Sequence, residues 1–179
     1  MGIKLNVGAS PIWIEKGWHI IDHKIKKNEG YNIAGNALSI NLEDNSCDII
    51  FCSHVFEHIP HTQLPLVISE FNRVLKPSGV LRLLTPDLAK MAKAYVNKDE
   101  NFFKLLKDED ESIRTDLGLG GMFLNTVVSP GQDTVLLDRT VSNFIAGYAH
   151  VYSYDYQMLD IILTKLGFKN RKAKFNDSN

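Results

Sequence analysis

The sequence predicts an α/β protein with a doubly wound, mostly parallel sheet. Apolar runs of strand length alternate with segments whose apolar residues recur at helical spacing. The clearest run, Ile49–Cys52, stops at the polar pair Ser53-His54, and a helical segment then leads to a second run at Gly79–Thr85. This order of strand, helix and strand is a βαβ unit, in which polar residues at strand ends lie where ligands bind.

Length and composition narrow the function classes. A chain of 179 residues is long enough for one α/β domain with a full core. A formal net charge of −1 gives no electrostatic basis for general binding to nucleic acid or to membrane surfaces. The sequence has no bilayer-spanning apolar run and no signal-peptide pattern, so we expect a cytoplasmic protein. Cys47 and Cys52 are too far apart along one strand for a disulfide and are expected to be buried thiols.

The N-terminal part of the chain predicts three strands. The first, Ile3–Val7, ends at the small residues Gly8-Ala9-Ser10, where a ligand could approach the backbone closely. The second, His19–Ile21, ends at Asp22, and a weaker strand is expected within Asn28–Ile33. The first strand should lie beside both the second strand and the central one, which makes its tip a topological switch point.

Three helices are expected after the central strand. The first, Leu64–Leu75, has apolar residues on one face and is ended by Pro77-Ser78-Gly79. Asp87 can cap the second helix, and Asp155 can cap the last one, which Gly167 closes. We expect residues 1–179 to form a single domain, with a partly helical insertion or lid at about 97–149.

Several motifs together resemble a known family. They are Leu5-Asn-Val-Gly-Ala-Ser10, Gly17-Trp-His-Ile-Ile-Asp22, Asn36-Ala37, Ser46–His58, Arg73–Arg82 and, near the end, His150–Asp155. In order and spacing they resemble the class I S-adenosylmethionine-dependent methyltransferases, and in particular the type 11 branch. The resemblance implies a Rossmann-like sheet of order 3-2-1-4-5 plus a C-terminal strand. It also implies S-adenosyl-L-methionine as cofactor and S-adenosyl-L-homocysteine as product.

The same resemblance implies a set of cofactor contacts at the strand tips. These residues are Asn6, Gly8, Ala9, Ser10, Asp22, Asn36, Ala37, Leu38, Ser53 and His54. Asp22 would hold the ribose hydroxyls, whereas Asn36 and its neighbours would border the adenine. Ser53 and His54 would close the methionine side and face the methyl acceptor.

The acceptor is expected to be a small-molecule or carbohydrate hydroxyl, by analogy with related sequences. A hydroxyl acceptor gains from a general base whose pKa lies near neutrality, which suits histidine. His54 and His150 are the candidate catalytic residues. Tyr148, Tyr152 and Tyr154 either line an acceptor pocket or belong to the core.

Two alternatives remain open. His54, Glu57 and His58 match the H-x-x-E-H pattern of inverted zinc peptidases, which requires the motif to lie within a helix and a further ligand such as His61 or Glu70. We expect no metal here, because a buried strand runs directly into His54. The other alternative is a catalytically inactive binding protein of the same fold, since Ala9-Ser10 replaces the family's usual second glycine.

The C-terminal end of the sheet is expected to be incomplete. The family's sheet ends with an antiparallel pair of strands, but only one strand candidate, Phe168–Phe175, follows Gly167. Either the sequence is part of a longer chain or a second copy completes the sheet, which would give a homodimer through the uncovered edge.

Overall fold

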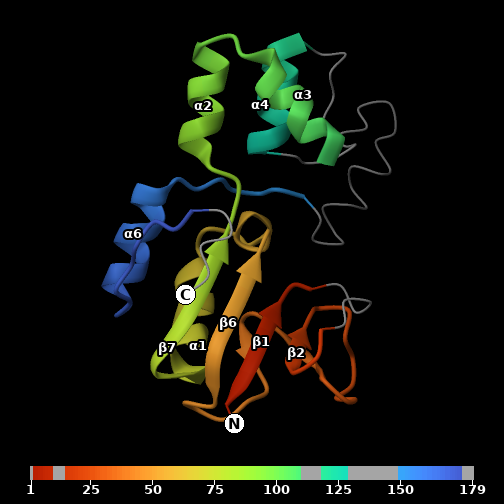
Figure 1. Ribbon diagram of the computed structural model, residues 1–179, viewed down its shortest axis with the longest axis vertical. Coiled ribbons are helices and arrows are strands. Elements are labelled where there is room, and N and C mark those ends of the chain that lie inside the picture. Colours follow the sequence, from red (N-terminus) through yellow and green to blue (C-terminus); the bar gives the residue numbers. More distant parts are fainter. Residues whose placement is uncertain (1, 10–14, 110–117, 129–148, 175–179) are drawn as a thin grey trace. The chain divides into compact units, whose positions relative to one another are not determined.

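The computed structural model describes residues 2–9, 15–109, 118–128 and 149–174 (Figure 1). The chain divides into two compact units, and each is described by itself. The first unit comprises Met1–Phe51, Pro65–Arg82 and Tyr156–Asn179, and the second comprises Cys52–Leu64 and Leu83–Asp155.

A five-stranded sheet organises the first unit. Its strands are β1 (Ile3–Val7), β2 (Trp18–Ile21), β3 (Asn32–Ile33), β6 (Cys47–Ser53) and β7 (Leu75–Leu84), in the order β3-β2-β1-β6-β7. The pairs β1–β2 and β2–β3 are parallel. The remaining strands, β4 and β5, pair only with each other. When they are left out, β6 and β7 are the fourth and fifth strands of the main sheet, which therefore has the predicted order 3-2-1-4-5. The predicted doubly wound α/β fold is confirmed.

The central strands form because their side chains are apolar on both faces. Leu5 and Val7 of β1, Ile20 and Ile21 of β2, and Ile50 of β6 are all buried. A parallel strand covered on both faces shows such near-continuous apolar runs rather than alternation. Cys47 and Cys52 of β6 are buried free thiols, as predicted.

Two helices flank the sheet in the first unit. Helix α1 (Leu64–Val74) buries the apolar face that the sequence predicted, which consists of Leu64, Val67, Ile68, Phe71 and Val74. Helix α6 (Tyr156–Lys165) buries Leu159 and Leu163, again as predicted. The Asn72 side-chain amide of α1 donates to the Leu166 carbonyl at 3.1 Å, which joins the two helices.

Two local expectations need correction. The expected third strand is only Asn32–Ile33, because the chain then turns into an unpredicted antiparallel hairpin of β4 (Gly35–Asn36) and β5 (Ser39–Ile40). Strand β7 begins at Leu75, directly after α1, and not at Gly79. Local sequence signals are weakest for segments that are too short to show a periodic pattern and for the ends of helices.

The expected C-terminal strand does not form within residues 168–174. This segment alternates poorly, because Lys169, Arg171, Lys172 and Lys174 leave few apolar positions to face a sheet. The carbonyl of Lys174 instead accepts a hydrogen bond from the Arg82 guanidinium of β7 at 3.1 Å. Pairing of this edge with a second copy stays a prediction.

In the part of the second unit that the structure describes, the regular structure is mainly short helices. They are the 3₁₀ helix η1 (Phe56–His58), α2 (Leu88–Val96), α3 (Glu100–Glu109) and α4 (Gly118–Val127). Asp87 caps α2 as predicted, since its carboxylate accepts from the backbone N–H groups of Ala89 and Lys90. The insertion expected at 97–149 is therefore helical in its described parts.

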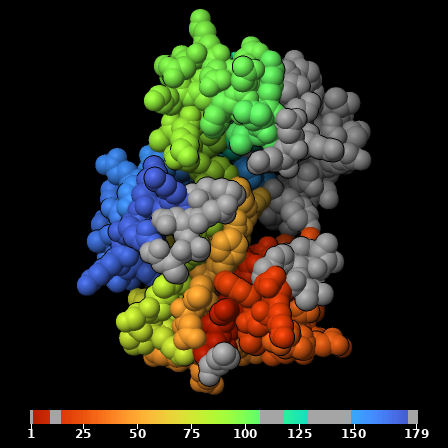
Figure 2. All heavy atoms as spheres, viewed as in Figure 1, coloured from red at the N-terminus to blue at the C-terminus, as the bar shows by residue number. Residues whose placement is uncertain are grey.

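Helices α2, α3 and α4 share a small apolar core. Met91, Ala94, Phe103 and Met122 are buried together, and partly buried side chains such as Phe123 pack around them. Tyr95 stacks on Phe123 with ring centroids 4.8 Å apart. The surfaces of α2 and α3 lie directly against each other in the space-filling view (Figure 2). Within the described residues, no helix is both long and apolar enough to cross a bilayer.

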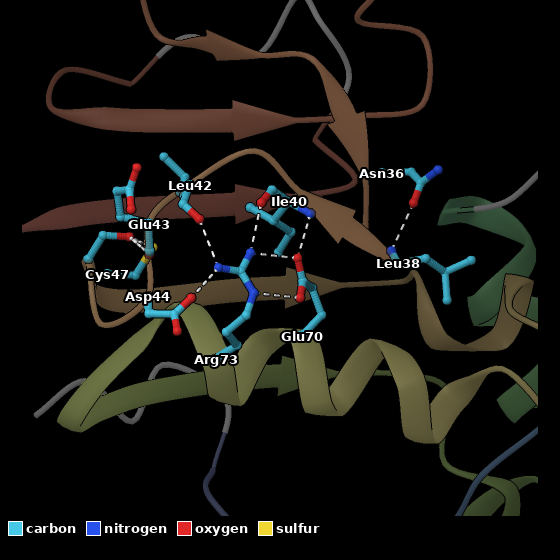
Figure 3. Close-up of polar contacts among 10 residues, drawn as sticks. Asn36, Leu38, Ile40, Leu42, Glu43, Asp44, Cys47, Glu70 and Arg73 are labelled. Atoms are coloured by element: carbon cyan, nitrogen blue, oxygen red, sulfur yellow. Dashed lines mark hydrogen bonds and ion pairs between the residues drawn. The ribbon is translucent and has the colours of Figure 1, made fainter.

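Arg73 of α1 holds the segment that leads from the hairpin into β6 (Figure 3). Its guanidinium donates to the carbonyls of Ile40 and Leu42, each at 2.9 Å, and to the carboxylates of Asp44 and Glu70 at 2.6 and 2.8 Å. The second Glu70 oxygen accepts from Arg73 Nε at 2.8 Å, so this ion pair is bidentate. The Arg73 hydrogen bond lowers the pKa of Glu70, so the stability from this pair is present above the ordinary glutamate pKa and is lost as the pH falls below it.

We expect Arg73→Lys to lower the free energy of unfolding by about 1–3 kcal/mol, because a lysine ammonium cannot reproduce the forked set of donors. Urea denaturation followed by circular dichroism measures the change. Arg171→Lys is the matched control, the same change at an exposed position. An equal effect of the two substitutions would contradict the structural role of Arg73.

Candidate functional site

The tips of β1 and β2 lie next to each other in the first unit. Val7 and Ile21 are register partners in the parallel pair, so Gly8 and Asp22 follow aligned positions. The Gly8 N–H donates to the Ile21 carbonyl at 2.8 Å, and Gly8 has a φ of 78°, a conformation that favours glycine. Gly8 thus turns the chain sharply beside Asp22.

Two polar side chains at these tips are buried. Asn6 is 5% exposed and Asp22 is 9% exposed. Asp22 Oδ1 accepts from the Lys24 N–H at 2.9 Å and lies 3.5 Å from His23 Nδ1. The carboxylate therefore shapes the turn after β2, and its predicted contact with ribose hydroxyls stays a prediction.

The β4–β5 hairpin packs against the end of β2. A Cβ on Gly35 would lie 2.7 Å from the Ser39 carbonyl oxygen and 3.3 Å from Ile21 Cδ1, so this position needs glycine. Asn36 Oδ1 accepts from the Leu38 N–H at 2.8 Å and closes the turn (Figure 3). Asn36, Ala37 and Leu38, which were predicted to border the adenine, thus form the hairpin turn, where the Leu38 side chain is exposed.

The other predicted cofactor residues fall elsewhere. Ala9 follows Gly8 and is half-buried, whereas Ser10 lies outside the described residues. Ser53 is the last residue of β6, and both Ser53 and His54 belong to the second unit. The strand order places β6 next to β1, as the prediction required.

A cluster of polar side chains gathers around Glu57 in the second unit. His54 directly follows β6 and has a φ of 54°, which is unusual for a residue other than glycine. Its Nδ1 lies 3.0 Å from Glu57 Oε1, while the ring is 65% exposed and the Glu57 side chain is 1% exposed. A buried carboxylate therefore orients a histidine ring that is itself largely exposed.

Glu57 has further partners. Thr85, just after β7, donates its hydroxyl proton to Glu57 Oε2 at 3.2 Å. Burial by itself would raise the pKa of Glu57, but the hydrogen bond from His54 and the neighbouring histidines outweigh it and lower the pKa below its ordinary value. The Glu57 carbonyl accepts from the N–H groups of Val151 and Tyr152 at 2.8 and 3.3 Å. Glu57 thus links η1 to Thr85 and to the segment at 149–154.

His58 and His150 lie next to each other in this cluster. His58 Nδ1 lies 3.1 Å from the Ala149 carbonyl oxygen, and His150 Nδ1 lies 3.3 Å from the Thr126 carbonyl oxygen. The two ring centroids are 4.9 Å apart. Burial is the main cause that lowers the pKa of His58, so its neutral form is favoured. Both predicted catalytic histidines, His54 and His150, therefore belong to the surroundings of Glu57.

Two of the three tyrosines named in the sequence analysis, Tyr152 and Tyr154, lie in the described part of the chain. Tyr154 is fully buried and packs edge-on to Phe56, and burial raises its pKa to about 12. Tyr152 stacks on His61 with ring centroids 4.4 Å apart. Tyr154 is thus a core residue, whereas Tyr148 lies outside the described residues.

The H-x-x-E-H pattern does not lie within one helix. His54 follows the end of β6, and only Phe56–His58 form the short 3₁₀ helix η1. The structure therefore does not meet the condition that the inverted zinc peptidases require of this motif.

Comparison with known proteins bears on the first unit most directly. Residues 19–83 match the family described as "Methyltransferase domain" (Methyltransf_11). The predicted resemblance to the class I methyltransferases is confirmed. This methyltransferase match runs from β2 to the end of β7 and includes Asp22, the hairpin and Glu57.

A curated relative supports the same assignment. A stretch of 49 residues is 43% identical to "Probable methyltransferase ltbC" from Aspergillus luteorubrus. The alignment covers 26% of this chain and 17% of that relative's length. The similarity thus concerns a methyltransferase segment and not the relative's whole length.

From the sequence, Glu57 was named only as part of the H-x-x-E-H pattern and was given no role in methyl transfer. Thr85 also escaped notice, since a threonine at the end of a strand is common. The signal for Glu57 was present in the spacing of His54, Glu57 and His58. The spacing could not show that His150 and Thr85, from distant parts of the chain, lie next to Glu57.

Cys52 lies close to this cluster but is unsuited to nucleophilic chemistry. It is fully buried, and burial together with the charge of Glu57 strongly raises the pKa of its thiol. Burial likewise raises the pKa of the Cys47 thiol. The structure thus assigns both cysteines to the core.

We expect neither thiol to react with a disulfide reagent such as Ellman's reagent while the protein is folded, and both to react after unfolding in guanidinium chloride. The absorbance of the released thiolate measures the reaction in both states. Rapid labelling of Cys52 in the folded protein would contradict its buried placement.

Proposed function

We propose that this protein is an S-adenosylmethionine-dependent methyltransferase that methylates a hydroxyl group of a small molecule or carbohydrate. The methyltransferase match over residues 19–83 carries the proposal, because it falls on a sheet with the strand order expected for this class. When bound, S-adenosyl-L-methionine supplies a methyl group on a sulfonium centre, and an in-line displacement needs the acceptor held against it.

The first unit has features that suit such a cofactor. Gly8 has no side chain and follows β1 at the position aligned with the buried Asp22. A carboxylate at the end of the second strand can accept hydrogen bonds from a ribose diol. We propose that Asn6, Gly8, Ala9 and Ser10 contact the methionine and ribose parts. The hairpin turn at Asn36, Ala37 and Leu38 would border the adenine.

In the second unit, His54 is our proposed general base. A hydroxyl acceptor must lose its proton during methyl transfer, and a neutral imidazole can accept it. The Glu57 carboxylate accepts a hydrogen bond from the Nδ1–H group of His54, so the lone pair of the neutral ring lies on Nε2. Glu57 thereby acts as a positioning residue that fixes the tautomer and orientation of His54. His150, the second predicted base, contacts the carbonyl of Thr126 and supports the same region.

Two further expectations accompany the proposal. The buried free thiols of Cys47 and Cys52 suit a reducing compartment, which supports a cytoplasmic location. A catalytically inactive protein of the same fold remains the alternative outcome of the experiments below.

We expect Asp22→Ala to weaken the binding of S-adenosyl-L-homocysteine at least about 10-fold, because hydrogen bonds to a charged group contribute about 1.5–3 kcal/mol. Isothermal titration calorimetry measures the affinity. Asp22→Asn keeps a side-chain oxygen that can accept the hydrogen bond from the Lys24 N–H. It therefore distinguishes a loss of ligand contacts from a loss of the turn after β2. Asp44→Asn is a control in the same unit. Unchanged affinity in Asp22→Ala would show that the ribose assignment is wrong.

We expect His54→Asn to lower the methylation rate by about 10²–10⁴-fold, the usual contribution of a general base, while cofactor affinity changes much less. Asparagine can still donate to Glu57 but cannot accept the acceptor's proton. Production of S-adenosyl-L-homocysteine with a panel of sugars and small alcohols gives the rate. Glu57→Gln should shift the pH profile of the rate as well as lower it, as expected of a positioning residue.

Cofactor binding without turnover on the whole panel would favour the inactive alternative. An unchanged rate and pH profile in both variants would contradict the roles of His54 and Glu57.

A further inference from the structure

A second arrangement around Glu57 is not used by the proposed methyl transfer. Glu57, His58 and His150 each offer one metal-ligating atom, and these three atoms lie within 4.8 Å of one another. Glu57 and His58 come from η1, whereas His150 comes from the segment that follows α4 in the chain. All three residues belong to the second unit.

The hydrogen bonds of the two histidines set their tautomers. A backbone carbonyl can only accept, so the Nδ1 atoms facing Ala149 and Thr126 must carry the protons. Each neutral ring then has its lone pair on Nε2. Metal-binding histidines are commonly held in this way, with the second ring N–H donated to a backbone carbonyl or carboxylate.

Thr126 makes this support rigid. Its carbonyl is among the last of helix α4, where backbone carbonyls have no partner within the helix. The Thr126 hydroxyl donates back to the Met122 carbonyl at 2.8 Å, and Ser153 donates to the Val127 carbonyl. The end of α4 is thus fixed to the segment that carries His150.

Glu57 has the capacity to bind a cation in addition to its present partners. Its Oε1 accepts a hydrogen bond from the His54 ring, and its Oε2 accepts one from the Thr85 hydroxyl. A carboxylate has about four lone-pair sites, so two such bonds do not exhaust it. The side chain is buried, and a buried negative charge is stabilised by a nearby cation.

We propose that Glu57, His58 and His150 form a binding site for a divalent first-row transition metal such as Zn²⁺. Two imidazoles and one carboxylate are a ligand set for such metals, and they leave coordination positions open. Mg²⁺ and Ca²⁺ prefer oxygen ligands throughout and fit this set poorly. The set differs from the H-x-x-E-H reading, because His150 takes the place of His54, whose Nδ1 is held by Glu57.

Binding would draw the three donors together. Ligands at about 2.0–2.1 Å from a tetrahedral metal lie roughly 3.4 Å apart, so a pair of donor atoms at the 4.8 Å limit would close by about 1.4 Å. The metal would then connect η1 with the distant segment around His150. We expect it to stabilise the folded state, because the unfolded chain does not hold the three ligands together and so binds the metal more weakly.

The test is metal binding by the full chain after treatment with a chelator and removal of the chelator. Titration with Zn²⁺ by calorimetry should give one equivalent bound, and the melting temperature should rise. Titration with Co²⁺ should give visible d–d absorption of the intensity expected for four or five ligands. These readouts do not depend on methyltransferase activity, so failure here leaves the proposed function untouched.

Two conservative variants locate the site. Asparagine can reproduce the Nδ1–H donor of histidine but has no Nε2, so His58→Asn and His150→Asn should keep their carbonyl hydrogen bonds. We expect each to bind Zn²⁺ at least 10-fold more weakly than the unaltered protein, with little change in the melting temperature of the metal-free form. His61→Asn, an exposed histidine of the same unit outside the three ligands, should bind as the unaltered protein does.

The proposal would be overturned by no binding of Zn²⁺ or Co²⁺ at millimolar concentration, or by equal binding in all the variants, which indicates scattered surface histidines. If an asparagine variant does not fold, the stoichiometry and the Co²⁺ spectrum of the unaltered protein decide the question. A Co²⁺ spectrum identical to that of the free aqueous ion would exclude the site.

Discussion

The buried carboxylate of Glu57 is the constraint around which the second unit is arranged. A charge with 1% exposure is costly unless it is paired and hydrogen-bonded, and here both oxygens have partners. The partners come from three places, namely the end of β6, the end of β7 and, through the Glu57 backbone, the segment at Val151. Satisfying one carboxylate therefore fixes the positions of the residues that could act on a substrate.

The same constraint explains the unusual backbone at His54. A non-glycine residue at a φ of 54° is tolerated only where its surroundings compensate. His54 gains a hydrogen bond to Glu57 through its ring and one to the Leu84 carbonyl through its N–H, at 3.0 Å. The strained turn lets the ring reach Glu57 and leaves most of it exposed. This combination of a fixed and an accessible imidazole is what base catalysis needs.

The first unit positions its candidate residues in a different way. There the parallel register of β1 and β2 aligns Gly8 with Asp22, and the Gly35 turn packs the hairpin against Ile21. Arg73 then secures the chain between the hairpin and β6 through two carboxylates and two carbonyls. In the first unit, backbone pairing and the Arg73 guanidinium thus hold the candidate residues in position. In the second unit, the buried Glu57 carboxylate has this role.

The order of the strands was implied by the resemblance to the methyltransferases. The sequence by itself determined the longer strands of the sheet, the buried face of α1, the cap at Asp87 and the two core cysteines. These features follow from periodicity, side-chain polarity and capping residues, all of which can be seen within a short stretch of sequence. Only the tertiary structure decided the hairpin at Gly35, the contacts of Arg73 and the meeting of His58 with His150. The contacts of Arg73 with the segment before β6 and that between the two histidines join residues far apart in the chain, so no local pattern encodes them. The strands of the hairpin are two residues each, which is too short for a periodic pattern. The expected strand after Gly167 was wrong over residues 168–174 for the related reason that a strand needs a partner as well as a sequence.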